Sequence, residues 1–343
     1  MATTTIGWGD GSGDNLYLTY PSASGNQTIS VTSDANGGAA RSKVVSFSAT
    51  GVSPVSLTIS QAAGQITPNH PCLTFKSTGS NTLSMECNGT ASPTLYYSTD
   101  GTTWTLWDYS ALPISDGHPV FIYGNNTSGF NSSTSNYARF VIGGDSNVTC
   151  QGNIMVLIAG TETRTTIPAN YYFARIFRNN TKLISAPSFP ATTLKNYCYY
   201  QAFSGCTGLT SAPTLPATTL TRSCYDGMFY GCSSLTSAPQ LNATTMQRQC
   251  YYQMFRGCSN LETAPDLPAT TLAQDCYSQM FYQCGKLNYV KALFTTTPGS
   301  GYTTNWLYGV ASTGTFVKNS AATWTNTGVS SVPSGWTVQT ASS

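Results

Sequence analysis

Cysteine is the side chain with the most potential for chemistry in this chain, because eleven cysteines accompany two histidines. Eight of them recur every 26 residues in two sets: Cys198, Cys224, Cys250 and Cys276, and Cys206, Cys232, Cys258 and Cys284. Such regular spacing raises the possibility of a metal site or a ladder of disulfides. Zinc sites use cysteine pairs two to four residues apart or nearby histidines, and these sets provide neither.

A third interpretation places both cysteine sets in the core. Free cysteine packs as a small buried hydrophobe, and Tyr172 and Asn180 occupy the corresponding positions of a leading half unit. A position that accepts tyrosine or asparagine needs to be filled and does not need sulfur. Neighbours within a set could in principle bridge. We nevertheless predict eight buried, reduced thiols, with no metal and no cofactor.

Carboxylate pairs and histidines are the other groups that could support catalysis. Two carboxylates can hydrolyse a glycoside, but Asp10 and Asp14 flank a Gly-Ser-Gly run in an expected arm. Asp108 and Asp116 fall at expected strand ends, where solvated acids are common. A nucleophilic triad would need His70 or His118. We therefore predict no catalytic residue.

Two further sequence features with possible chemistry are weaker. The run DGSGDN at 10–15 lacks the glutamate and the following helix of a calcium loop. His70 lies between two prolines in a segment expected to link two domains.

The composition excludes several classes of partner. Charged residues make up 8% of the chain and the net charge is +2, so no basic patch for nucleic acid or anionic lipid is present. The N-terminus lacks the basic and apolar regions of a secretory signal, and no apolar run is long enough to span a membrane. We expect synthesis and retention in a cytosol, or release within a larger assembly.

Internal repetition decides the predicted architecture. Residues 183–286 divide into four units of 26 residues, and residues 167–182 form a degenerate half unit before them. Each unit begins with a short extended run such as LTSAPTLP and continues with an apolar pattern such as CYDGMFYGC, which fits one face of a helix. The recurring phenylalanines are expected to be core residues: Phe203, Phe229, Phe255 and Phe281. A strand and a short helix per unit predict an α/β leucine-rich-repeat solenoid.

Upstream of the repeats, runs separated by turns rich in Gly, Asn and Pro predict strands, among them NLYLTY, CLTFKS, TLSMEC, YARFVIGG and NIMVLIA. The expected organisation is a flexible arm that serves as an anchor (1–15), an immunoglobulin-like β-sandwich (16–65), a second β-sandwich domain (70–160), the solenoid (161–290) and a C-terminal cap (291–343). The fold class is thus multidomain: two β-sandwiches followed by a short α/β solenoid.

The repeat units resemble BspA-type leucine-rich repeats, through LTSAPxLPATTL and CYxxMFxGC. The flanking segments TLYYSTDGTTWTLW, VFIYGNN, GNIMVLI and VPSGWTVQ are similar to those that accompany such repeats in surface proteins of gut anaerobes and their phages. The resemblance covers about residues 72–340. The run VVSFSATGVSPVSLTISQAAG resembles the end of BACON-type immunoglobulin-like domains, which occur in crAss-like phage virion proteins.

These resemblances imply adhesion by a structural protein that is not an enzyme. Because no export signal is present, the favoured interpretation is a phage virion component: a head fibre, a tail fibre or a capsid decoration protein. The implied partners are other virion proteins, copies of the same chain, and a host-surface glycan or protein. The alternatives are a BspA-like adhesin on a bacterial cell surface and an accessory module of a carbohydrate-active enzyme.

Exposed aromatic and small polar residues are the candidate binding groups, because sugars present hydroxyls and apolar ring faces. Trp104 and Trp107 lie three apart in an expected strand, so one of them should face outwards as a sugar platform or pack between domains. The varying residues at one position of the units form a second candidate: Ser188, Thr214, Gln240 and Asp266. In the arm, Ile6 and Trp8 are the candidate apolar anchors.

Overall fold

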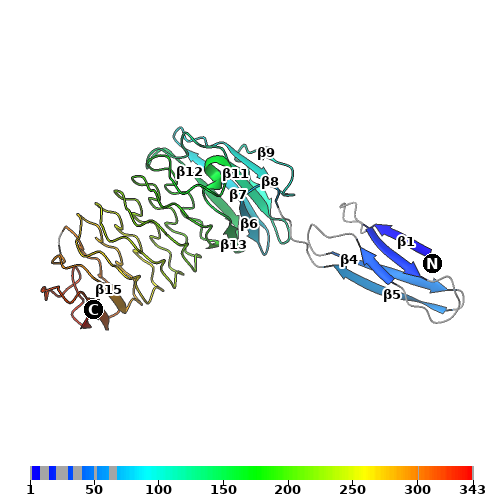
Figure 1. Ribbon diagram of the computed structural model, residues 1–343. Coiled ribbons are helices and arrows are strands. Elements are labelled where there is room, and N and C mark those ends of the chain that lie inside the picture. Colours follow the sequence, from blue (N-terminus) through cyan, green and yellow to red (C-terminus); the bar gives the residue numbers. More distant parts are fainter. Residues whose placement is uncertain are drawn as a thin grey trace. The chain divides into compact units, whose positions relative to one another are not determined.

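The computed structural model of the chain describes residues 2–7, 15–20, 30–33, 41–49, 52–61, 68–299 and 301–341. The chain divides into two compact units, one of Met1–Thr67 with Asp116–His118 and one of Pro68–Ser115 with Pro119–Ser343. Strands are the main regular elements of both units, and loops form much of the second (Figure 1). No described helix is long and apolar enough to cross a membrane.

The first unit contains two antiparallel sheets. One has the order β1-β2-β3, from β1 (Ala2–Gly7), β2 (Asn15–Tyr20) and β3 (Ser30–Ser33). The other pairs β4 (Arg41–Ala49) with β5 (Val52–Gln61). Leu16 and Leu18 alternate along β2 and pack with Val45 of β4, so the two sheets share one small core.

Part of the predicted flexible arm is a strand. Residues 2–7 form β1, in which Ile6 pairs with Leu16 of β2. The segment has three consecutive threonines followed by Ile6, and β-branched residues favour strands. Trp8 and the rest of the arm, 8–14, lie outside the described residues.

The second unit begins with two sheets that enclose a core. The three-stranded sheet has the order β10-β7-β12, from β7 (Asn81–Asn88), β10 (Leu112–Ile114) and β12 (Tyr137–Gly144). The other has the order β14-β13-β6-β11-β8-β9, from β6 (Leu73–Ser77), β8 (Leu95–Ser98), β9 (Thr105–Leu106), β11 (Val120–Gly124), β13 (Val148–Gln151) and β14 (Leu183–Ser185). Phe75 of β6 and Phe140 of β12 meet between them, with ring centroids 5.2 Å apart.

The prediction of an α/β leucine-rich-repeat solenoid is wrong. Residues 183–286, all of which the structure describes, contain no α-helix, and β14 at their start is the one strand assigned to them. A single four-residue helix, α1 (Val156–Ala159), precedes the repeats in the described part of the chain. In Figure 1 the green-to-yellow ribbon of the repeats consists of loops. The fold is almost entirely β, with five small sheets among the described residues.

Backbone conformation explains why the helical pattern does not form a helix. In the second repeat unit (209–234), Ser223, Gly227 and Gly231 have φ of 51°, 59° and 73°, so every fourth residue is left-handed. A left-handed residue interrupts the α-helix. The other units repeat this four-residue spacing, and each helical segment of the prediction is therefore a series of tight turns.

Hydrogen bonds within and between units satisfy this backbone. The N–H of Met228 donates to the carbonyl of Tyr225 three residues earlier, at 3.2 Å. The N–H of Tyr225 donates to the carbonyl of Cys250 in the next unit, at 3.1 Å. Alternate residues follow these two patterns, so successive units stack in register without a helix.

The C-terminal segment covers the last unit. β15 (Tyr289–Ala292), β16 (Gly314–Lys318) and β17 (Trp336–Thr340) form a parallel sheet in that order. Trp306 is fully buried against Tyr277 of the last unit, with ring centroids 6.2 Å apart. Large aromatic rings therefore close the end of the stacked core.

Candidate functional site

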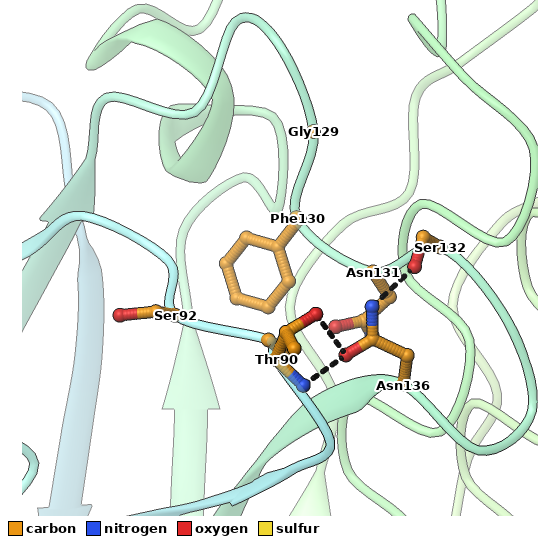
Figure 2. Close-up of a pocket in the computed structure, with 8 residues that line it drawn as sticks. Thr90, Ser92, Gly129, Phe130, Asn131, Ser132 and Asn136 are labelled. Atoms are coloured by element: carbon orange, nitrogen blue, oxygen red, sulfur yellow. Dashed lines mark hydrogen bonds between the residues drawn. The ribbon is translucent and has the colours of Figure 1, made fainter.

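A pocket of about 220 Å³ lies between two loops of the second unit. One loop, residues 90–92, follows β7, and the other, residues 129–132 with Asn136, leads into β12. Figure 2 shows the Phe130 ring among the polar side chains of both loops. The ring is 4% exposed, so it forms an apolar floor.

Asn136 holds the two loops together. Its Oδ1 accepts hydrogen bonds from the backbone N–H of Thr90 at 2.7 Å and from the Thr90 hydroxyl at 3.3 Å. Its Nδ2 donates to the Ser132 hydroxyl at 2.6 Å. Gly89 permits this close approach, because a Cβ there would lie 2.8 Å from Asn136 Oδ1.

A second asparagine fixes the base of the pocket. Asn131 is buried, its Nδ2 donates to the carbonyls of Ala138 and Ala174, and its Oδ1 accepts from the N–H of Ala138 at 2.7 Å. Because Ala174 belongs to the half unit before the repeats, the pocket loop is tied to both parts of the second unit.

The lining combines one aromatic face with hydroxyl and amide groups, and none of the lining residues is charged. The Ser132 hydroxyl keeps its own proton for donation, and Thr90 Oγ1 keeps its lone pairs. The volume lies below the roughly 300 Å³ at which pockets for drug-sized ligands begin. Such a pocket can accept a single small ring that carries hydroxyls.

Trp104 belongs to a surface cluster of four half-buried rings. Tyr123 lies between His70 and Tyr96, with centroid distances of 4.0 and 4.9 Å in near-parallel stacks. Trp104 meets Tyr123 edge to face at 4.8 Å, and its Nε1 donates to Asn69 Oδ1 at 2.9 Å. The cluster braces the start of the second unit against β8 and β11.

Trp107 is a core residue, 3% exposed, and its Nε1 donates to the Ser110 carbonyl at 2.9 Å. Both tryptophans flank β9, which consists of Thr105 and Leu106 alone. The strand that was expected to include both tryptophans therefore contains neither of them.

The variable position of the repeats is exposed in all four units. Its two ends are already bonded: the Ser188 hydroxyl donates to the Gly152 carbonyl at 3.1 Å, and Asp266 pairs with Lys291 at 2.6 Å. Thr214 and Gln240 lie between them and face solvent.

All eight repeat cysteines are fully buried and unbridged. Burial raises the pKa of their thiols, to about 12 for Cys206 and Cys284. The repeat phenylalanines are also fully buried, and their rings stack along the units, as for Phe229 and Phe255 at 5.6 Å. Both sets belong to the core of the second unit.

The acids weighed as catalytic groups serve local roles or stand in solvent. Asp108 is exposed and accepts hydrogen bonds from the Ser110 N–H and hydroxyl, which hold its pKa below the usual value. Asp116 and His118 are exposed, whereas Asp10 and Asp14 lie outside the described residues. In the part of the chain that the structure describes, no group of three or more potential ligands could hold a metal ion.

Of the two candidate anchors, the structure describes Ile6. Its side chain is partly buried and packs against the core of the first unit.

Sequence reasoning missed the pocket. Its loop, 125–136, is a run of Asn, Thr, Ser and Gly in which Phe130 is the one large apolar residue. A lone aromatic in a polar loop was the available signal. Residues 90–92 line the pocket only through contacts with a segment distant in the sequence, and no local sequence pattern predicts such contacts.

Comparisons of the chain with protein-family models, with curated proteins and with solved structures find no match.

Proposed function

We propose that the chain is an adhesion component of a phage virion, a head fibre, tail fibre or decoration protein, that binds a neutral host-surface glycan and catalyses no reaction. The observation that carries the proposal is the uncharged pocket over Phe130, with its hydroxyl and amide lining. A sugar ring presents an apolar face for the aromatic floor and hydroxyls for the polar rim.

The stacked repeats support the same proposal at a larger scale. Successive units are linked by backbone hydrogen bonds and share a continuous core with the sheets that carry the pocket. A binding site on such a body is held in a fixed geometry, so little conformational entropy is lost on binding. Multiple copies on a particle would raise the effective affinity of a weak site.

The test is a neutral-glycan array followed by titration calorimetry on the best ligand. The variant Ala91→Trp fills the pocket from a half-buried lining position and should lower affinity at least tenfold. Ala111→Trp, at an exposed alanine between β9 and β10, is the matched control and should leave affinity unchanged. Equal affinities for both variants would refute the pocket as the glycan site.

The virion location requires its own measurement. Mass spectrometry of purified particles should recover the chain in stoichiometric amounts with other virion proteins. Recovery from the surface of uninfected bacterial cells would favour the alternative of a cell-surface adhesin.

A further inference from the structure

Asp226 departs from the pattern of the repeats. The equivalent positions in the neighbouring units hold Tyr200 and Tyr252, and Ser278 occupies it in the last unit. Asp226 is 9% exposed, although a carboxylate is rarely buried without a partner. The second repeat unit thus holds a buried acid where the other repeat units stack without one.

Two buried oxygen atoms beside Asp226 lack hydrogen-bond partners among the described residues. Ser223 is fully buried, and its Oγ is unpartnered. Gln201 Oε1 is also buried and unpartnered. Backbone bonds place both residues next to Asp226: the Gln201 N–H donates to the Asp226 carbonyl at 2.8 Å, and the Asp226 N–H donates to the Ser223 carbonyl at 3.3 Å.

The Asp226 carboxyl has no basic neighbour in the described part of the chain. Burial raises its pKa to about 7, and the Ser223 hydroxyl alone opposes that rise. The Asp226 charge raises the pKa of the Tyr252 phenol, which lies in the next repeat unit. The nearby Arg256 guanidinium instead lies over the rings of Tyr230 and Tyr282, at 5.4 and 4.4 Å from their centroids.

The last unit provides an internal contrast. There the two residue types are exchanged, and the Ser278 hydroxyl donates to Asp275 Oδ1 at 3.1 Å. Asp275 is half-buried, so solvent reaches it. A carboxyl and a hydroxyl at these two positions can therefore form a hydrogen bond, whereas in the second repeat unit the Ser223 hydroxyl faces the Asp226 carboxyl without a hydrogen bond of normal geometry.

Gly227 opens space beside this cluster. Gln201, Gln253 and Gln279 occupy its position in the other units. A Cβ on Gly227 would meet the Gln201 side chain, with Cγ at 3.2 Å, and nothing else closer than 3.9 Å. The units before and after contribute the half-buried rings of Tyr200 and Tyr252. Gly227 thus lacks the side chain that the other three units carry at this position, next to the buried oxygen atoms of Ser223 and Gln201.

We propose that Asp226, Ser223 and Gln201 bind the primary ammonium group of an amino sugar whose ring packs against Tyr200 or Tyr252. An ammonium group has three N–H donors and no acceptor, and it can donate to the Asp226 carboxylate, to the lone pairs of Ser223 Oγ and to Gln201 Oε1. Charge-assisted hydrogen bonds are about twice as strong as neutral ones, and tyrosine rings attract a cation. This proposal rests on the proposed glycan-binding function and adds a second, charge-selective site to it.

The test uses the full chain and NMR titration with D-glucosamine, N-acetyl-D-glucosamine and methylammonium. Glucosamine should bind at least tenfold more tightly than its N-acetyl analogue, because acetylation removes the charge and two donors. Asp226→Asn should abolish this preference, and Asp275→Asn, the matched control in the last unit, should preserve it. Equal binding of the two sugars, or an unchanged preference in Asp226→Asn, would overturn the proposal.

Gly227→Gln gives a second variant that retains the fold. Glutamine already adopts the same left-handed conformation at this position, with φ of 51°, 53° and 55° in Gln201, Gln253 and Gln279. The added side chain should occupy the space that Gly227 leaves beside Gln201 and lower glucosamine affinity at least tenfold. Unchanged affinity in this variant would place the ammonium elsewhere.

Methylammonium supplies the pH dependence, because its charge is constant between pH 5 and pH 8. Its affinity should rise by about tenfold per pH unit up to pH 7 and then level off, since binding requires the Asp226 proton to leave. A flat profile would contradict the site.

A lysine side chain also carries a primary ammonium group. If Nα-acetyl-lysine amide bound more tightly than glucosamine, the ligand would be a protein and not an amino sugar.

The two proposed sites fail separately. Ala91→Trp should abolish neutral-glycan binding and leave the glucosamine preference intact, whereas Asp226→Asn should do the reverse. Loss of both activities in one variant would contradict two independent sites.

Discussion

At the residue scale, one cysteine set is explained by a hydrogen bond. The thiols of Cys206, Cys232, Cys258 and Cys284 each donate to the carbonyl of a phenylalanine 29 residues earlier, at 3.0–3.2 Å. In the leading half unit, Asn180 Nδ2 donates to the carbonyls of Phe140 and Phe177 instead. The position therefore requires a small buried donor, which cysteine and asparagine both provide.

The two cysteine sets should respond differently to serine. Cys258→Ser keeps a donor that can reach the Phe229 carbonyl, so we expect a loss in the free energy of unfolding below about 1 kcal/mol. Cys250 contacts the Met246 sulfur at 3.8 Å, and its thiol has no oxygen acceptor among the described residues, so Cys250→Ser should lose about 1–3 kcal/mol. Urea denaturation measures both values. Equal losses would show that the thiol hydrogen bond is unimportant.

Removal of one buried tyrosine hydroxyl should stabilise the protein. Tyr225 Oη is buried with no hydrogen-bond partner in the described chain, and Phe173 fills the equivalent position in the half unit. Tyr225→Phe should therefore raise the free energy of unfolding by up to about 2 kcal/mol. Tyr172→Phe is the control, because that hydroxyl donates to the Asn126 carbonyl and its loss should destabilise. Thermal denaturation of both variants distinguishes the two cases.

Asp226 should make stability depend on pH. Its folded-state pKa of about 7 lies above the ordinary value of 3.8, so the protonated form is favoured in the folded state. The contribution of Asp226 to the free energy of unfolding is therefore fully present below pH 3.8 and is lost as the pH rises to about 7. The advantage of Asp226→Asn over the native protein should widen by about 2–3 kcal/mol from pH 5 to pH 8. Urea denaturation at pH 5 and pH 8 measures this difference, and Asp275→Asn is the control. The same pH dependence in Asp226→Asn and Asp275→Asn would contradict the assignment to Asp226.

At the element scale, glycine distinguishes the turns from a helix. Gly257 has φ of 76°, and a Cβ there would meet nothing closer than 3.6 Å. In an α-helix, glycine to alanine stabilises by about 1 kcal/mol. In this left-handed position, Gly257→Ala should destabilise by about 1–2 kcal/mol. The sign of the change in urea denaturation therefore tests the backbone conformation directly.

The apolar pattern of the repeats predicted which residues are buried but not their backbone. Over Cys224, Tyr225, Met228, Phe229 and Cys232, a period of 3.6 and a period of four place the same residues inside. The signal that separates them is Gly227 and Gly231, two glycines four residues apart, because both adopt positive φ.

Strand prediction succeeded where local alternation was sufficient. The runs at β2, β6 and β7 alternate apolar and polar residues, and all three are strands. The apolar run NIMVLIA, expected as a strand, instead leads into α1, since a continuous apolar run does not distinguish the two. The candidate site was less predictable, because Thr90 and Asn136 come together only through the loops that follow β7 and precede β12.

At the scale of the whole molecule, the sheets and the repeats share one core. β14, the start of the first repeat unit, pairs in parallel with β13 of the six-stranded sheet. The Phe140 ring of β12 stacks on Phe177 of the half unit at 5.5 Å. Residues on both sides of the expected boundary at 160 are therefore buried in the same hydrophobic cluster.

This shared core predicts where the chain can be divided. A fragment of residues 68–343 keeps the whole hydrophobic cluster from Leu73 to Trp336, so it should fold, unfold in a single transition and retain the Phe130 pocket. A fragment that ends at Ala159 loses β14 and Phe177, and it exposes the β13 edge and Phe140. Such an edge promotes association between chains. We expect this fragment to aggregate or to lack a cooperative transition in calorimetry. A soluble, cooperatively folded fragment ending at Ala159 would show that the sheets do not depend on the repeats.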